Sequence, residues 1–227
     1  MKKSATDEMT AIVLLGGDAI SPTSVGDLPD NAVVIAADSG VHVAHQLGLS
    51  VDVVIGDLDS VNQTALAALV ALGTTVIRHP ADKNESDAEL ALRHAAAIGV
   101  SRIILVGGGG GRLDHQLSTY AVMFLAALSD IQLEARIAAS RAYPIRTGET
   151  LNITCPPNSV VGLIPFGGDA QDITTHGLQW PLTDETLHIA ASRGISNRSV
   201  GTDFSVMLGT GQLIVTVDAP IHDAISR

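Results

Sequence analysis

Residues 51–60 read VDVVIGDLDS. The apolar run in this stretch stops at Gly56, and two carboxylates follow one residue apart, at Asp57 and Asp59. A short, almost wholly apolar run is typical of a strand buried on both faces, as strands of parallel sheets are. The stretch therefore predicts a buried parallel strand whose carboxyl end carries two acidic side chains.

Similar runs recur through the first 140 residues and alternate with Ala/Leu-rich stretches of helical spacing. The runs are residues 11–15, 32–37, 74–78 and 101–106, and the stretches between or after them are 40–48, 62–72, 86–98 and 114–128. Ser86, with Glu89 three residues later, has the spacing of a capping box at a helix start. Strands that alternate with helices in this way predict an α/β fold with a parallel sheet covered on both faces.

The composition and the hydrophobic pattern of the sequence change after about residue 142. Prolines and glycines become frequent, and short alternating runs appear at 149–154, 159–164, 186–190 and 212–217. Alternation with period two between turn residues is typical of antiparallel strands. We therefore expect two domains: an α/β domain over residues 1–142 and a small antiparallel β domain over residues 143–227.

Composition and charge exclude several classes of partner. The 227 residues are 46% hydrophobic, which fits a globular protein, and they carry a formal net charge of −11. Such a charge argues against nucleic-acid backbones and anionic membranes as partners. Cys155 is the single cysteine, so no intramolecular disulfide forms, and the apolar run 11–15 is too short for a signal peptide or a membrane span. We expect a cytoplasmic protein without nucleic-acid or membrane partners.

Glycines and acidic residues follow one predicted strand after another. They occur at residues 16–18, 38–40, 56–60, 82–87 and 107–115. In an open parallel sheet, ligands bind beyond the carboxyl ends of the strands, and these ends meet at one edge. The sequence therefore predicts an acidic pocket at this edge.

Asp57 and Asp59 are the strongest candidates for metal ligands in that pocket. If the segment is extended, both side chains point to the same side, about 7 Å apart. Carboxylate oxygens favour Mg²⁺ or Ca²⁺ over Zn²⁺, and Mg²⁺ combines one or two carboxylates with substrate phosphates. The alternative is a solvated turn in which Asp59 or Ser60 caps the next helix, and the motif alone leaves both interpretations open.

The five glycines at 107–111 lie between a predicted strand and a predicted helix. In that position backbone N–H groups can cradle a phosphate. The loop is not a Walker motif, because Arg112 and Leu113 follow Gly111 where Lys and Ser or Thr are required. Arg112 adds a fixed cation suited to phosphate, and Asp114 and His115 add further polar groups.

Other polar or reactive residues have plainer explanations. His42 and His45 are expected on an exposed helix face, since no third metal ligand follows at suitable spacing. Cys155 is expected to be a small core residue. No GxSxG motif is present, which argues against a serine hydrolase.

Taken together, the motifs resemble one known family. ADSG (37–40), GDLDS (56–60), DKNESDAELAL (82–92) and GGRLDH (110–115), in this order and spacing, resemble the thiamine pyrophosphokinase family. GLQWPL (177–182) and SN (196–197) are similar to that family's thiamine-binding β domain. The resemblance implies an α/β catalytic domain followed by a β-sandwich, assembled as a homodimer. It also implies transfer of the pyrophosphoryl group of ATP to the hydroxyethyl oxygen of thiamine, giving thiamine diphosphate and AMP.

The resemblance also implies residue roles. Asp57, Asp59 and Asp87 would hold Mg²⁺, and Asp38 would shape the same acidic edge. The nucleotide and its phosphates would meet Gly109, Gly110, Gly111, Arg112, Asp114 and His115. Trp180, Ser196 and Asn197 would line the thiamine, at a dimer interface where one chain supplies the catalytic edge and the other the β domain.

Three alternatives remain open at this point. The chain could be a pyrophosphokinase of another hydroxyalkyl heterocycle, such as a pterin, since the catalytic motifs would be shared. It could be a non-catalytic thiamine- or nucleotide-binding regulator, although the acidic residues whose loss would mark one are all present. Trp180, the single tryptophan, could fill the core of the β domain instead of offering its face to a cationic heterocycle.

Overall fold

The computed structural model describes residues 9–218 and divides the chain into two compact units. The first unit ends at Ala138 and the second begins at Ala139, in the turn between strands β6 and β7. The outer ends of the two expected domains, residues 1–8 and 219–227, lie outside the described residues.

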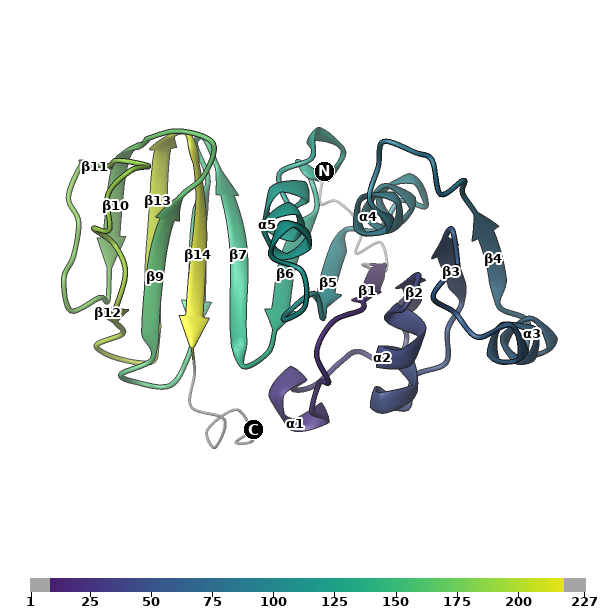
Figure 1. Ribbon diagram of the computed structural model, residues 1–227. Coiled ribbons are helices and arrows are strands. Elements are labelled where there is room, and N and C mark those ends of the chain that lie inside the picture. Colours follow the sequence, from purple (N-terminus) through teal and green to yellow (C-terminus); the bar gives the residue numbers. More distant parts are fainter. Residues whose placement is uncertain (1–8, 219–227) are drawn as a thin grey trace, which may run out of the picture. The chain divides into compact units, whose positions relative to one another are not determined.

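The first unit is built on a parallel sheet with the strand order β6-β5-β1-β2-β3-β4 (Figure 1). All neighbours in this order run parallel. The strands are β1 (Thr10–Leu15), β2 (Val33–Ala37), β3 (Val53–Gly56), β4 (Thr75–Arg78), β5 (Arg102–Val106) and β6 (Gln132–Ile137). The expected parallel α/β sheet is thus confirmed, and β3 is the strand that ends at Gly56.

Strand β6 was not predicted, because its sequence QLEARI contains two charged residues. Both are nevertheless buried: Glu134 and Arg136 pair with each other at 3.0 Å, and Arg136 Nη1 also donates to the carbonyls of Val25 and Asp27. A buried charge is tolerated when it is paired and hydrogen-bonded, so a strand with two charged residues can still be buried.

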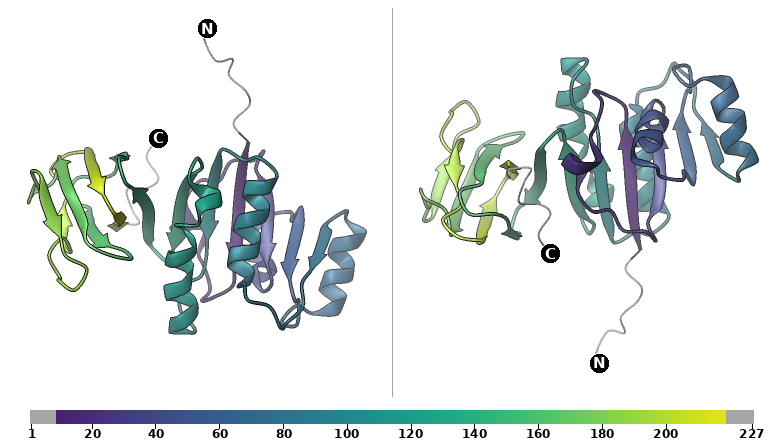
Figure 2. Two further views of the ribbon diagram at one scale, coloured as in Figure 1. Left: turned by 90° about the horizontal axis from the view of Figure 1, so that it is seen from above. Right: turned by 90° about the horizontal axis from the view of Figure 1, so that it is seen from below.

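Helices lie on both sides of this sheet (Figure 2). They are α1 (Pro22–Val25), α2 (Gly40–Leu47), α3 (Gln63–Ala71), α4 (Asp87–Ala97) and α5 (Leu113–Val122), followed by a short 3₁₀ turn at Ala126–Leu128. The helix expected over 114–128 therefore ends earlier, at Val122. Helices α4 and α5 contact each other, and α4 packs on β1, β2 and β3.

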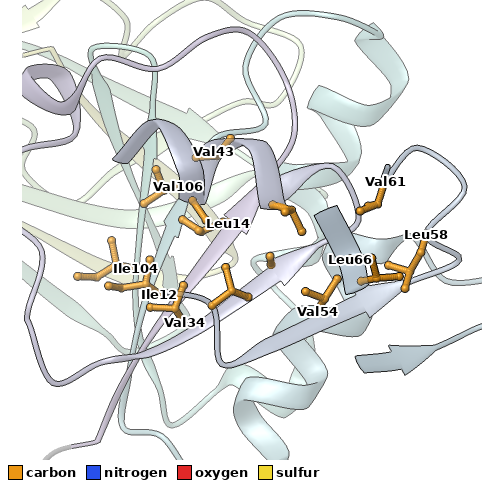
Figure 3. Close-up of a cluster of buried hydrophobic side chains, with 14 of the residues drawn as sticks. Ile12, Leu14, Val34, Val43, Val54, Leu58, Val61, Leu66, Ile104 and Val106 are labelled. Carbon is orange, nitrogen blue, oxygen red and sulfur yellow. The ribbon is translucent and has the colours of Figure 1, made fainter. Parts of the chain in front are cut away.

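Side chains of β1, β2, β3 and β5 meet those of the helices in the cluster of Figure 3. Leu58, the residue between the two acidic side chains of the opening stretch, belongs to this cluster and is only 1% exposed. Burying a leucine of this kind contributes about 1.5–3 kcal/mol relative to leaving it in water. The turn after β3 is therefore anchored in the core by its middle residue.

Helix α4 begins where the sequence predicts. The Ser86 hydroxyl accepts a hydrogen bond from the Glu89 backbone N–H at 3.2 Å, which caps the helix. The Glu89 carboxylate pairs with Arg93 one turn later, at 2.7 Å. Because Ser86 fixes the start, Asp87 occupies the first helical position, beside the ends of the strands.

The second unit is a β-sandwich. Its two sheets have the orders β12-β9-β14-β7 and β11-β10-β13-β8, and their pairs are antiparallel. The strands are β7 (Ser140–Arg146), β8 (Thr150–Thr154), β9 (Val160–Pro165), β10 (Ala170–His176), β11 (Glu185–Leu187), β12 (Asn197–Arg198), β13 (Asp203–Thr210) and β14 (Gln212–Asp218). Side chains from both sheets form one buried cluster, which includes Cys155, as expected.

Strands β7, β10, β12 and β13 were not predicted. Strand β10, AQDITTH, shows the reason: its outward positions are polar and its register shifts opposite β11, so few apolar residues remain to mark it. The buried members Ala170, Ile173 and Thr175 become visible as a core face only once the partner sheet is in place.

The close approach of α2 to β1 gives a testable requirement for Gly40. A Cβ at this position would lie 2.1 Å from the carbonyl oxygen of Leu14, a backbone atom that cannot move aside. Gly40→Ala should therefore lower the free energy of unfolding by about 1–3 kcal/mol, measured by urea denaturation. Gly168→Ala, where nothing lies within 4 Å, is the matched control and should be near neutral. Equal stability of the two variants would contradict the close approach.

Candidate active site

The carboxyl ends of the strands in the first unit surround a pocket of about 560 Å³. Its lining comes from the loops after β1, β2 and β5, from the start of α4 and from α5. Among the residues predicted for the site, Asp38, Asp87, Gly110, Gly111, Arg112, Asp114 and His115 line this pocket. The sheet edge that the sequence predicted as a ligand site is therefore hollow, and several charged side chains line the hollow.

The turn after β3 gathers its carboxylates in a way that the sequence did not predict. Leu58 has a positive φ of 61°, so residues 57–59 are not extended. The turn lets the Asp59 N–H donate to Asp57 Oδ1 at 3.3 Å. Oxygens of Asp57, Asp59 and Asp38 all lie within 4.8 Å of one another. Leu58, at the middle of this turn, is buried in the core.

Asp38 is held firmly at the end of β2. Its backbone N–H donates to the carbonyl of Ile55 on β3 at 2.9 Å, and its Oδ2 accepts from the hydroxyl of Ser60. Its other oxygen, Oδ1, is buried and has no hydrogen-bond donor among the described residues. A buried carboxylate oxygen without a donor is costly unless a ligand or cation satisfies it.

Gly56 makes room for this arrangement. A Cβ at this position would lie 3.0 Å from Asp87 Oδ1 and 3.2 Å from the Cβ of Asp38, and the backbone has a φ of +145°. Both features favour glycine. The glycine that ends the apolar run thus lets the carboxylates of two other loops close over the strand end.

Lys83 was not predicted, yet it lies among these carboxylates. Its Nζ is 3.4 Å from Asp57 Oδ2 and 3.1 Å from Asp87 Oδ1, and its side chain is 11% exposed. A signal was available: Lys83 is the only lysine between residues 9 and 218, and it precedes Asp87 by four residues in the loop after β4. Asp87 therefore joins the group through Lys83, whereas Asp38 joins Asp57 and Asp59 directly.

The local charges shift the pKa values of these groups in opposite directions. The N–H of Asp59 is the largest influence on Asp57 and lowers its pKa; burial opposes this, and the charge of Lys83 lowers the pKa further. Burial raises the pKa of Asp87, although Lys83 opposes the rise. Burial by itself would lower the pKa of Lys83, but its ion pairs with Asp87 and Asp57 outweigh this and raise it. Lys83 thus stabilises the charged form of Asp57 at the edge.

The glycine loop is joined to the loop after β1. The Gly108 N–H donates to the Gly16 carbonyl at 3.0 Å, and the Asp18 N–H donates to the Gly109 carbonyl at 2.9 Å. Within residues 9–218, the N–H groups of residues 109–111 donate no hydrogen bond. Phosphate binding by these N–H groups stays a prediction of the sequence.

Arg112 and Asp114 form a two-point ion pair at the start of α5. Arg112 Nε and Nη2 lie 3.1 Å and 2.6 Å from the two oxygens of Asp114, and the His115 N–H donates to the same carboxylate at 3.0 Å. The pair lowers the pKa of Asp114 and raises that of Arg112. Both side chains are exposed, so the guanidinium can exchange its partner for a phosphate without breaking a buried contact.

The remaining predicted residues lie together in the second unit. Trp180 is 55% exposed, so it does not fill the core of the sandwich. Its backbone is held by the buried Asn197, whose side chain accepts from Trp180 N at 3.1 Å and donates to Trp180 O at 2.8 Å. Ser196 is exposed, with a positive φ of 60°. Asn197 thus fixes the loop that presents the indole.

The donor set at the edge of the first unit fits a hard divalent cation. Asp38, Asp57 and Asp59 offer only oxygen atoms, at mutual distances that one ion can span, and Asp38 Oδ1 has no hydrogen-bond partner within residues 9–218. Mg²⁺ has this preference for carboxylate oxygens. The helix face with His42 and His45 is exposed, as expected.

Fold and site together define the class: a parallel α/β unit with an acidic strand edge beside a glycine-rich loop, followed by a β-sandwich. Sequence comparison gives the family. Residues 27–135 match the thiamin pyrophosphokinase catalytic domain, and residues 150–214 match the thiamin pyrophosphokinase vitamin B1 binding domain. The chain belongs to the thiamin pyrophosphokinase family.

Individual relatives agree with this assignment. Thiamine pyrophosphokinase of Bacillus subtilis is 23% identical to this chain, and the match covers 90% of this chain and 95% of the relative. A crystal structure of thiamine pyrophosphokinase from Bacillus subtilis superposes with a TM-score of 0.81 at 21% identity. The superposition covers 93% of this chain and 99% of that structure's chain. Thiamine pyrophosphokinase 1 of Arabidopsis thaliana is 28% identical over 64% of this chain. The match spans 57% of that plant relative's length.

Helices long and apolar enough to cross a membrane are absent from residues 9–218.

The lowered pKa of Asp57 predicts how stability depends on pH. A carboxylate whose folded pKa lies below its unfolded value of 3.8 contributes stability above that value, and this contribution is lost as the pH falls through the folded pKa. In buffer with EDTA, wild type should therefore melt above Asp57→Asn at about pH 7, and the difference should shrink below about pH 4. Thermal melts across this range measure it. An Asp57→Asn protein that is more stable than wild type at neutral pH would contradict the assignment.

Proposed function

We propose that this protein transfers the pyrophosphoryl group of ATP to thiamine, producing thiamine diphosphate and AMP. The observation that carries the proposal is the convergence of Asp38, Asp57 and Asp59 beside the pocket of the glycine loop, in a chain that matches both domains of the family. In the reaction, the hydroxyethyl oxygen of thiamine bonds to the β-phosphorus of ATP. The bond from that phosphorus to the oxygen that leaves with AMP breaks, and the hydroxyl proton is released.

The acidic edge is assigned to Mg²⁺. Asp57 and Asp59 would hold the ion, with Asp38 as a further ligand and Asp87 adjoining through Lys83. When bound, Mg²⁺ neutralises the negative charge that develops on the phosphates. Because transfer of this kind needs little covalent help, the main task of the chain is to position and neutralise the triphosphate.

The glycine loop and the start of α5 are assigned to the nucleotide. The N–H groups of Gly109, Gly110 and Gly111 point to phosphate binding, since they have no partner within the described residues. Arg112 supplies a planar fork for two phosphate oxygens, and Asp114 holds that fork in place until the nucleotide arrives. His115 lines the same pocket.

The acceptor is assigned to the second unit. Thiamine carries a fixed positive charge on its thiazolium ring, and an exposed indole offers a face to such a cation. Trp180 has this exposure, Asn197 fixes its backbone, and Ser196 adds an exposed hydroxyl beside them.

We assign the protein to the cytoplasm. Its single cysteine is buried and unpaired, which fits a reducing compartment, and its net charge is −11.

The activity test uses purified protein, ATP, Mg²⁺ and thiamine, with AMP and thiamine diphosphate followed by chromatography. Asp59→Asn should lower turnover by about 10²-fold or more, because charge stabilisation at the phosphates is lost. Asp130→Asn makes the same change in charge at an exposed position and should stay near wild type. Release of AMP only with a pterin alcohol, and not with thiamine, would overturn the assignment of the acceptor.

We further propose a homodimer in which each site takes its acidic edge from one chain and Trp180 from the other. Asp57→Asn and Trp180→Ala chains should each be inactive alone. In a mixed dimer one site then carries both lesions and the other carries neither, so random re-pairing restores about a quarter of all sites. Activity of the mixture, with subunit exchange verified by mass spectrometry, measures this. No recovery after verified exchange would place the whole site within one chain.

A further inference from the structure

Four carboxylates meet at the acidic edge, and one lysine lies among them. Asp38, Asp57 and Asp59 share a group of oxygens within 4.8 Å, and Asp87 faces the same strand end beside Gly56. Lys83 Nζ lies between Asp57 and Asp87, at 3.4 Å and 3.1 Å. It is the only lysine between residues 9 and 218, in a chain with a net charge of −11.

The position of this ammonium group resembles that of a bound cation. It is nearly buried, and two oxygens from different elements, the turn after β3 and the start of α4, converge on it. Lysine is a compact point charge on a flexible stem, so it can occupy such a position and leave it again at little steric cost.

We propose that Lys83 is the counter-ion of the acidic edge in the ligand-free protein, and that it yields Asp57 to the divalent cation and then binds the triphosphate. This inference rests on the proposed function, since it assumes a metal–triphosphate ligand. Two positive charges a few ångströms apart repel, so the ammonium and the metal ion compete for Asp57. Once displaced from Asp57, the ammonium remains next to Asp87, which lines the pocket assigned to the triphosphate.

Two binding measurements without catalysis distinguish this role from a merely structural one. Mn²⁺ binding, followed by electron paramagnetic resonance without nucleotide, should tighten about tenfold in Lys83→Met, because the competing charge is gone. Binding of a non-hydrolysable ATP analogue with Mg²⁺, followed by calorimetry, should weaken about tenfold in the same variant, because a phosphate contact is lost. General damage to the site would weaken both the Mn²⁺ affinity and the affinity for the ATP analogue. Only the counter-ion role predicts that one affinity rises while the other falls.

Two control variants complete the series. Arg93→Met removes the same charge from the exposed outer face of α4, where Arg93 pairs with Glu89, and both affinities should stay near wild type. Lys83→Arg keeps the charge, and its Mn²⁺ affinity should stay close to that of wild type. Equal Mn²⁺ affinity of wild type and Lys83→Met would overturn the inference while leaving the metal site intact. Absence of Mn²⁺ binding in every variant would overturn the metal assignment as well.

Wild-type protein provides a second measurement that does not depend on the folding of a variant. Acetylation of Lys83 by acetic anhydride, quantified by peptide mass spectrometry, reports the accessibility of the amine. Mg²⁺ alone should raise the acetylation, because the side chain leaves its nearly buried position, and the ATP analogue with Mg²⁺ should lower it again. Acetylation that is unchanged or lowered by Mg²⁺ alone would contradict the displacement of Lys83.

Discussion

Mutual repulsion among carboxylates at one edge of a parallel sheet is the constraint on which the rest of the site depends. Asp38, Asp57 and Asp59 bring oxygens within 4.8 Å of one another, where like charges raise each other's free energy unless a cation lies between them. The fold holds them there by local contacts: a backbone hydrogen bond from Asp38 to β3, the hydroxyl of Ser60, and the N–H of Asp59. Lys83 offsets part of the repulsion.

The burial of Leu58 connects this edge to the stability of the domain. The same turn that sends Leu58 into the core forces Asp57 and Asp59 outward, so apolar packing supplies free energy that keeps two charges together. Gly56 is the complementary feature, since the absence of a side chain there leaves room for Asp87 and Asp38. Packing and electrostatics thus meet within the four consecutive residues 56–59. This arrangement supports the cation site proposed for the edge.

The β-sandwich presents an aromatic side chain, that of Trp180, to solvent. A large exposed aromatic side chain needs a rigid support to be useful for binding, because an unsupported loop would lose conformational entropy on every encounter. Asn197 supplies that support through two hydrogen bonds to the backbone of Trp180, and is itself buried. Asn197, which the family resemblance places at the ligand, thus fixes the backbone of Trp180, and its own contact with the ligand stays a prediction.

The sequence by itself determined the class of fold and the edge at which the site lies. Hydrophobic periodicity and residue composition were sufficient to predict five of the parallel strands and the helix start at Ser86. Buried strands and helix caps have local sequence signatures. Strand β6 left none, since its buried Glu134 and Arg136 are tolerable only as a pair. Tertiary structure alone decided that Asp38 is the direct neighbour of Asp57 and Asp59, that Asp87 joins them through Lys83, and that residues 57–59 form a turn. These contacts join loops that follow different strands, and local sequence carries no information on which of several charges at one sheet edge come to face each other.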